Sequence, residues 1–171
     1  DDDDDGDDND DDDDGEDDDD EYKRQGIKKI KKINCNPDGN FNHNPEPLPE
    51  NITDLCSEVK RGKYQLGIVV DPDADRLVLV DERGEPFGKE YTLVAAAEYL
   101  LSKNHGASTC SNLSSTLALK NITEKYGGKY FSSAVGEINV VQVMKEKKCL
   151  IGGEGNGGVI YPMTHYGRDS L

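Results

Sequence analysis

The fold class is decided by residues 108–152, which read STCSNLSSTLALKNITEKYGGKYFSSAVGEINVVQVMKEKKCLIG. Short strand-like segments alternate here with segments of helical length, and paired glycines close one of them. The pattern predicts a strand at 108–112, a helix at 115–126, a strand at 129–133, a helix at 136–147 and a strand at 149–152. Strands separated by helices of this length favour a mainly parallel sheet with right-handed crossovers. We therefore expect an α/β fold with flanking helices.

The residues before this stretch continue the same pattern. A helix is predicted at 90–103, and the segments 65–70 and 76–81 are typical of two paired buried strands. Further upstream, Asn51 is expected to cap a one-sided helix that stops at Gly62. We also expect a strand at 30–35, and a turn-rich strip at 85–89 suggests a boundary between residues 27–84 and residues 85–171.

The net charge of −16 comes from one end of the chain. Residues 1–21 contain sixteen Asp and two Glu without any Lys or Arg, which leaves 18 acidic against 20 basic side chains in the rest of the 171 residues. A basic run follows at 23–32. We expect residues 1–26 to be a disordered low-complexity tail, because nothing apolar offsets the entropy of ordering them.

Composition argues against two classes of partner. Nucleic acid is not expected, because the basic run lacks interleaved aromatic residues and adjoins 18 carboxylates that repel phosphate. A membrane is not expected, because no apolar run approaches the roughly 20 residues of a span. The cysteines lie far apart without a C-x-x-C pair, so we expect reduced thiols in or near the core and a cytoplasmic protein; they are Cys35, Cys56, Cys110 and Cys149.

The first candidate site is the segment Asp71-Pro-Asp-Ala-Asp-Arg76, directly after an apolar strand. Three carboxylates at alternate positions of a tight loop can present oxygens to one hard cation, and Mg²⁺ takes few protein carboxylates and completes its shell with water or phosphate. Asp71, Asp73 and Asp75 are therefore candidate Mg²⁺ ligands. Arg76 adds a positive fork suited to phosphate. The alternative is an acidic surface turn in which Asp73 is simply solvated.

The second candidate site is the glycine-rich segment 151–158, IGGEGNGG. It contains a formal G-x-G-x-x-G, but the β-like segment 159–162 follows where a dinucleotide site needs a helix, so NAD is not expected. A backbone with so few side chains could approach a polyhydroxyl ligand closely, and Glu154 and Asn156 would be its hydrogen-bonding side chains. A flexible connection is the alternative.

Other polar residues carry weaker signals. His43, next to a Pro-rich segment, is interpreted as a structural hydrogen-bonding residue. His165 and Arg168 are either ligand contacts or part of a solvated terminus. Ser114 and Ser115 are interpreted as helix caps rather than as a nucleophile.

Together these motifs resemble the α-D-phosphohexomutases, the family of phosphoglucosamine mutase, phosphomannomutase and phosphoglucomutase. The matching segments follow the family's order and approximate spacing, and they are 37–41 (PDGNF), 43–49 (HNPEPLP), 71–76 (DPDADR), 135–136 (VG) and 153–157 (GEGNG). Full-length members have four domains. The resemblance implies that residues 27–84 form the second half of domain 2 and that residues 85–171 form most of domain 3.

The resemblance also implies an activity, namely the reversible transfer of a phosphoryl group between the 1- and 6-positions of a hexose phosphate through a phosphoserine and a bisphosphate intermediate. By the same resemblance Asp71, Asp73 and Asp75 match the Mg²⁺ ligands and Arg76 a phosphate contact. The remaining matches are to substrate-binding positions, with the last two in the sugar-recognition loop: Gly136, Glu154 and Asn156.

The chain departs from the family pattern in two places. It has no Ser-His-Asn-Pro loop for the phosphoserine, and Gly157-Gly158 stands where many members have Gly-His. We therefore expect a fragment that is inactive by itself and depends on domains 1 and 4 of the same polypeptide. The alternative is a non-catalytic module that binds a sugar phosphate or a metal and uses its acidic tail for interactions.

Overall fold

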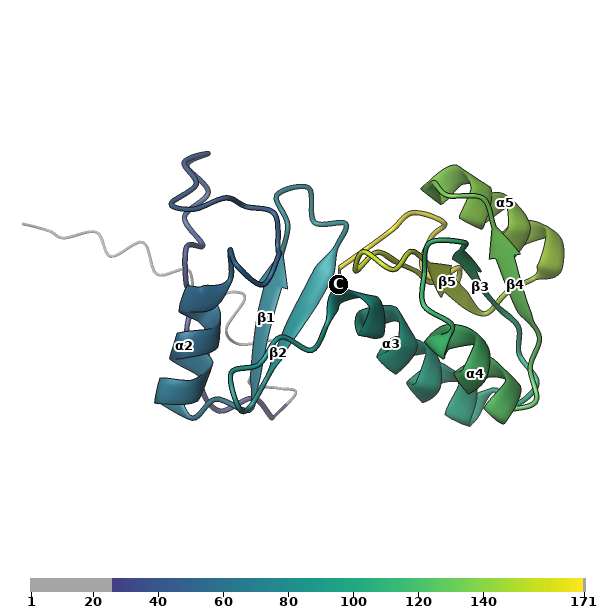
Figure 1. The fold of residues 1–171 in the computed structure, drawn as a ribbon, viewed down its shortest axis with the longest axis horizontal. Coiled ribbons are helices and arrows are strands. Elements are labelled where there is room, and N and C mark those ends of the chain that lie inside the picture. Colours follow the sequence, from purple (N-terminus) through teal and green to yellow (C-terminus); the bar gives the residue numbers. More distant parts are fainter. Residues whose placement is uncertain (1–25, 171) are drawn as a thin grey trace, which may run out of the picture. The chain divides into compact units, whose positions relative to one another are not determined.

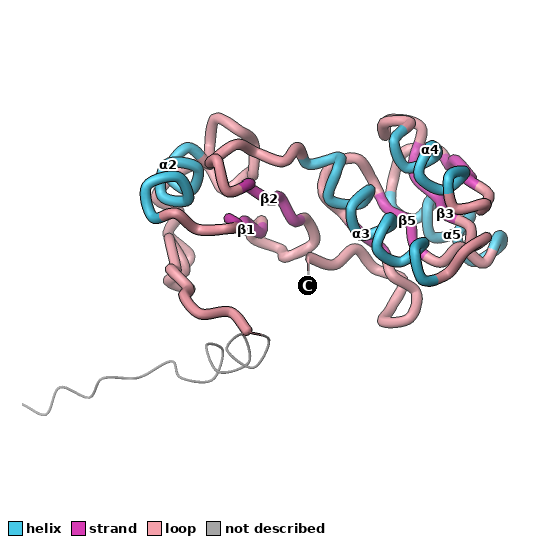
Figure 2. The backbone as a smooth tube through the Cα atoms, turned by 90° about the horizontal axis from the view of Figure 1, so that it is seen from below, coloured by secondary structure: helices cyan, strands magenta, loops and turns pink. Residues whose placement is uncertain are grey.

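A computed structural model describes residues 26–170 and divides the chain into two units, Asp1–Asn40 and Phe41–Leu171. In the first unit, residues 26–40 form no helix or strand (Figure 2). Ile27 and Ile30 are exposed. The strand predicted at 30–35 is therefore wrong. An extended segment becomes a stable strand only when a neighbouring segment pairs with its backbone, and residues 26–40 contain no such neighbouring segment. The predicted acidic tail lies outside the described residues, except for Gly26.

The first helix of the second unit packs on a hairpin (Figure 1). Strands β1 (Leu66–Val70) and β2 (Leu77–Asp81) pair antiparallel with Val70 opposite Leu77, so residues 71–76 form the loop that joins them. Helix α2 (Thr53–Gly62) lies against both strands and buries a small core of Ile52, Val59, Val78 and Val80.

The cap predicted for this helix is wrong. Ile52 occupies the position before the first helical residue, without a side-chain cap, because the Asn51 amide donates to the carbonyl of Glu46 at 2.8 Å instead. The helix ends as expected at Gly62, followed by Lys63 in the left-handed conformation (φ 52°).

The rest of the second unit is a three-layer α/β/α structure. The sheet has the order β4-β3-β5-β6, in which β3 is parallel to β4 and to β5, and β6 is antiparallel to β5. The four strands are β3 (Thr109–Asn112), β4 (Tyr130–Ser133), β5 (Ile151–Gly153) and β6 (Val159–Ile160). The mainly parallel sheet that we expected from the sequence is confirmed.

Helices cover both faces of this sheet. Helices α3 (Lys89–Lys103) and α4 (Ala118–Lys125) form one core with β5 through Leu93, Leu119 and neighbouring apolar residues. Helix α5 (Glu137–Lys147) lies on the other face of the sheet (Figure 1). It forms the other core through Val140 and Met144, which pack with Cys110 and Ile160. Within residues 26–170, no helix combines the length and apolar character needed to cross a bilayer.

Candidate functional site

Asp71 builds the loop between β1 and β2. Its Oδ1 accepts hydrogen bonds from the backbone N–H groups of Asp75 (3.1 Å) and Arg76 (3.0 Å), and its carbonyl accepts from the N–H of Ala74 (3.0 Å). Ala74 adopts the left-handed conformation (φ 56°), which turns the chain back toward β2. The loop therefore closes around one buried carboxylate, whose side chain is 0% exposed.

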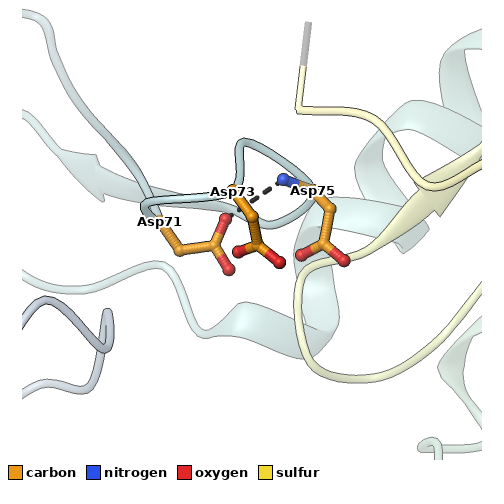
Figure 3. Close-up of side chains that lie close together, drawn as sticks. All are labelled: Asp71, Asp73 and Asp75. Atoms are coloured by element: carbon orange, nitrogen blue, oxygen red, sulfur yellow. Dashed lines mark hydrogen bonds between the residues drawn. The ribbon is translucent and has the colours of Figure 1, made fainter.

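The three aspartates lie on the same side of this loop (Figure 3). One carboxylate oxygen from each of Asp71, Asp73 and Asp75 lies within 4.8 Å of the others. Asp71 is buried, Asp75 is half-buried and Asp73 is exposed. The sequence prediction that the three carboxylates gather on one bend is thus met, and together they could hold a metal ion.

Charge within the loop is only partly balanced. Burial alone would raise the pKa of Asp71, but the hydrogen bonds from Arg76 and from the Asp75 N–H hold that pKa below its ordinary value. Burial, with the charges of Asp71 and Asp73, raises the pKa of Asp75 despite the nearby Arg168. The Oδ1 atom of Asp75 is buried and accepts no hydrogen bond from the described residues, although it lies 3.5 Å from Arg76 Nε. A buried carboxylate oxygen without a hydrogen bond, beside two other carboxylates, is suited to a bound cation.

Arg76 is already paired in this structure. Its Nε donates to Asp71 Oδ2 at 2.5 Å, and its two Nη atoms donate to the two carboxylate oxygens of Glu46 at 2.5 and 3.0 Å. These partners raise the pKa of Arg76, with the hydrogen bond to Glu46 as the largest cause. The guanidinium fork that we predicted as a phosphate contact therefore holds a carboxylate of the Pro-rich segment 44–49, which contains Glu46.

Glu154 lies at the carboxyl edge of the parallel sheet, where it follows β5. Its Oε1 accepts from Asn112 Nδ2 at 2.7 Å and from the backbone N–H of Gly136 at 3.1 Å. Asn112 ends β3 and Gly136 follows β4, so three adjacent strand ends converge on one buried carboxylate. This edge is where open α/β sheets bind ligands. Gly136 thus contributes a backbone donor, at φ 111°.

The glycine-rich loop after β5 is held rather than free. The N–H of Gly155 donates to Ser115 Oγ at 2.9 Å, and the N–H of Gly158 donates to Asn156 Oδ1 at 3.1 Å. The carbonyl of Gly157 accepts from the N–H of Leu77 at the start of β2 (3.1 Å). A Cβ on Gly157 would lie 2.8 Å from the Leu77 carbonyl oxygen, so only glycine allows this approach. The alternative of a flexible connection does not fit these contacts.

Arg168 joins the two candidate sites. Its Nη1 donates to Glu154 Oε2 at 3.0 Å, and its Nη2 donates to Asp75 Oδ2. Its backbone N–H donates to Glu137 Oε1 at 3.1 Å. Two bonds from Ser170 to the carbonyl of Ala74, through N–H (3.2 Å) and Oγ (2.9 Å), fix the same segment to the aspartate loop. Of the two open interpretations of Arg168, the structure rejects the solvated terminus.

The two histidines have local partners instead. His43 Nδ1 lies 2.7 Å from the carbonyl oxygen of Asn44, in keeping with the structural role predicted for it. His165 Nε2 lies 2.7 Å from Asp169 Oδ2, and its Nδ1 accepts from the N–H of Gly167.

Sequence reasoning did not single out two residues that shape the site, Glu46 and Asn112. It named Ser115 and Arg168 but did not predict the contacts that they make. The capping role predicted for the serines is wrong, because α4 begins only at Ala118 without a side-chain cap. Ser115 Oγ instead donates to Asn112 Oδ1 at 2.8 Å while it accepts from Gly155. A signal for Asn112 was present, since a polar residue at the end of a buried strand points to a ligand edge.

Comparison with known proteins places this architecture in a family. Residues 22–84 match the family model described as phosphoglucomutase/phosphomannomutase, alpha/beta/alpha domain II, and residues 88–171 match that of domain III. The chain belongs to the phosphoglucomutase/phosphomannomutase family. This confirms the resemblance inferred from the motifs.

Individual relatives agree with this assignment. The chain is 35% identical over 142 residues to a phosphoglucomutase/phosphomannomutase of Thermococcus kodakarensis, which covers 82% of this chain and 31% of that protein. It is 37% identical over 133 residues to a phosphoglucosamine mutase of Aliarcobacter butzleri, covering 75% and 29%. A crystal structure of a phosphoglucomutase/phosphomannomutase family protein from Burkholderia thailandensis matches with a TM-score of 0.68 and 30% identity, over 75% of this chain and 28% of that one. The chain spans about 30% of the length of the curated relatives it matches.

Proposed function

We propose that this chain supplies the metal loop and the sugar-recognition loop of a Mg²⁺-dependent phosphohexomutase. The full-length protein would interconvert the 1- and 6-phosphates of a hexose through a phosphoserine and a bisphosphate intermediate, with the phosphoserine provided by another part of the polypeptide. The observation that carries the proposal is the cluster of three carboxylate oxygens within 4.8 Å of one another, in which the buried Oδ1 of Asp75 accepts no hydrogen bond from the described residues.

Each residue has a distinct role in this proposal. Asp71, Asp73 and Asp75 hold Mg²⁺, which when bound neutralises charge on the transferring phosphoryl group. Glu154 accepts hydrogen bonds from sugar hydroxyls through the Oε2 atom that faces Arg168, while Asn112 and Gly136 fix its Oε1. Asn156 shapes the loop through its bond to the N–H of Gly158. Phosphoryl transfer depends mainly on positioning and charge neutralisation, which is what these groups provide.

Arg76 would meet the phosphate in competition with Glu46. A phosphate presents a pair of oxygens to a guanidinium much as a carboxylate does. The two Glu46 oxygens therefore occupy the positions on Arg76 that two phosphate oxygens would take. Because 38% of the Glu46 side chain is exposed, it can leave the fork without breaking a core contact. We propose that Arg76 keeps its bond to Asp71 and exchanges Glu46 for the phosphate.

We also propose that the protein acts in the cytoplasm. The cysteines in the described part of the chain are free. Burial raises the pKa of Cys110 to about 11 and that of Cys149 to about 12, so both stay protonated and unreactive near neutral pH. Cys35 is exposed, contrary to the expectation of a near-core position, and an exposed free thiol persists best in a reducing compartment.

The metal assignment is tested by Mg²⁺ titration of the chain in a calorimeter. The Asp73→Asn/Asp75→Asn double variant should lose at least about tenfold in Mg²⁺ affinity, because two of three charged ligands become neutral. The matched control is Asp81→Asn/Glu85→Gln, which removes two carboxylates from the turn at the far end of β2 and should leave the affinity unchanged. Equal Mg²⁺ binding by the two double variants would contradict the assignment.

A further inference from the structure

Arg168 holds carboxylates from three separate segments of the second unit. Its guanidinium contacts Asp75 from the aspartate loop, Glu154 from the loop after β5 and Glu137 from α5, the last at 3.2 Å from Nε. Only 19% of the arginine side chain is exposed. Charge pairs that are shielded from water interact more strongly than pairs at the surface. Because the three carboxylates share one guanidinium, a change in one of these pairs affects the other two.

We propose that Arg168 is a positioning residue that couples the aspartate loop to Glu154, so that a divalent cation bound at the loop changes how firmly Glu154 is held. This inference rests on the proposed function, because it takes the cation site from it. It goes further in assigning Arg168 the role of transmitting cation binding to the sugar-recognition loop.

The different surroundings of the two carboxylate oxygens of Asp75 support this coupling. Arg168 binds Oδ2, whereas the buried Oδ1 accepts no hydrogen bond from the described residues and has only Arg76 Nε at 3.5 Å, so Oδ1 is the oxygen that can meet the cation. A cation on Oδ1 draws negative charge away from the whole carboxylate, and the hydrogen bond from Arg168 to Oδ2 weakens. The positive charge of Arg168 then acts more on its two remaining partners, Glu154 and Glu137.

The backbone around Arg168 restricts its response to the side chain. Its own N–H is held by Glu137, the N–H of Asp169 donates to the carbonyl of Val159 at 2.9 Å, and Ser170 is held by Ala74. With its own N–H and the two residues that follow it anchored, we expect Arg168 to respond to a cation by a shift of its guanidinium between Asp75 and Glu154. Coupling between two sites needs such an element with two arrangements that each site biases.

Gly136 provides a reporter for this coupling. Its backbone N–H donates to Glu154 Oε1, so its amide resonance senses the charge and position of that carboxylate. Gly136 lies between β4 and α5, whereas the N–H of Asp75 and that of Ala74 belong to the aspartate loop itself. Amide resonances of residues 74 and 75 therefore report cation binding, and that of residue 136 reports its transmission.

The experiment is a Mg²⁺ titration of the 171-residue chain followed by ¹H–¹⁵N NMR. In the unchanged chain, the resonances of Ala74, Asp75 and Gly136 should all shift with one saturation curve. In Arg168→Met, which keeps an unbranched side chain but removes its charge, Ala74 and Asp75 should still shift and the Gly136 shift should be lost. Arg61→Met is the matched control, because it removes an arginine of α2 that pairs with its helix neighbour Glu58, and its Gly136 shift should be retained.

Arg168→Lys is the substitute test if Arg168→Met does not fold. A single ammonium cannot span two carboxylates as the planar fork does, so the Gly136 shift should fall by at least about half. A Gly136 shift that persists in full in either Arg168 variant, or that is missing in the unchanged chain while Ala74 and Asp75 respond, overturns the coupling and leaves the metal site intact. If Ala74 and Asp75 do not respond in the unchanged chain, both the coupling and the metal site are wrong.

Discussion

The Asp71→Asn variant is expected to lose about 3 kcal/mol of unfolding free energy, measured by urea denaturation in the presence of EDTA. Asparagine keeps the shape of aspartate and can still accept the N–H groups of Asp75 and Arg76 at Oδ1. Its amide nitrogen, however, places a donor where Oδ2 now accepts from Arg76 Nε at 2.5 Å. Two donors then face each other in a position that is shielded from water, and the positive charge of Arg76 loses its buried partner.

Asp81→Asn is the matched control for this loss. Asp81 closes the next turn with nearly the same pattern, since its Oδ1 accepts the N–H groups of Arg83 and Glu85, and its Oδ2 accepts the Arg83 guanidinium. That turn is open to solvent, where water replaces a lost partner, so we expect a much smaller loss. Similar losses in the two variants would show that burial of Asp71 does not determine its contribution.

The Asp71→Asn variant also has a pH signature. The pKa of Asp71 is lowered in the folded chain, so its ionised form contributes stability above the ordinary pKa of an unfolded aspartate, and this contribution disappears as the pH falls through the lowered value. The asparagine side chain of the variant has no proton to titrate in this range. The stability difference between the two proteins should therefore shrink toward acidic pH, and a difference that stays constant down to pH about 2 would contradict the assignment.

Local patterns in the sequence were enough to predict the alternation of helices and strands and the gathering of the three aspartates. The order of elements between residues 90 and 152 follows from segment lengths and glycines, and three carboxylates on one tight bend have few ways to separate. The strand at 30–35 failed for the converse reason. Its apolar residues indicate only a tendency to form a β-strand, whereas strand pairing depends on a neighbouring strand that local sequence does not specify.

The contacts that assemble the site are distant in sequence. Arg76 and Glu46 are 30 residues apart, Asn112 and Glu154 are 42 apart, and Arg168 and Asp75 are 93 apart. Such pairs form because packing of the sheet and its connections brings their segments together. The hydrophobic periodicity of the sequence does not predict such contacts. The carboxyl ends of β3, β4 and β5 form one edge only once the strand order is known, so a side chain such as Asn112 could be suspected but not paired.

Glu154→Gln is expected to lower kcat/KM for the hexose phosphate by about 100-fold in the full-length protein, because misplaced reacting groups cost turnover steeply. Glutamine can still accept the Asn112 and Gly136 donors, but its amide nitrogen turns a donor toward Arg168 Nη1, now 3.0 Å from Oε2. The same atom that would receive the sugar hydroxyl is thereby changed. Mg²⁺ affinity should change by less than about threefold, since Glu154 is not among the proposed ligands.

Glu137→Gln separates the loss of a sugar contact from the loss of an arginine partner. Glu137 also pairs with Arg168, through the backbone N–H and Nε, but it lies on α5 and takes no part in the proposed sugar contact. If Glu154 binds the sugar, Glu137→Gln should cost far less turnover than Glu154→Gln, although each removes one carboxylate from the same guanidinium. If the two variants lose turnover equally, Glu154 acts only by balancing the charge of Arg168. If Glu154→Gln weakens Mg²⁺ binding as much as turnover, its place in the sugar-recognition loop is wrong. The comparison therefore decides whether the carboxylate at the sheet edge meets the substrate or acts only through its pair with Arg168.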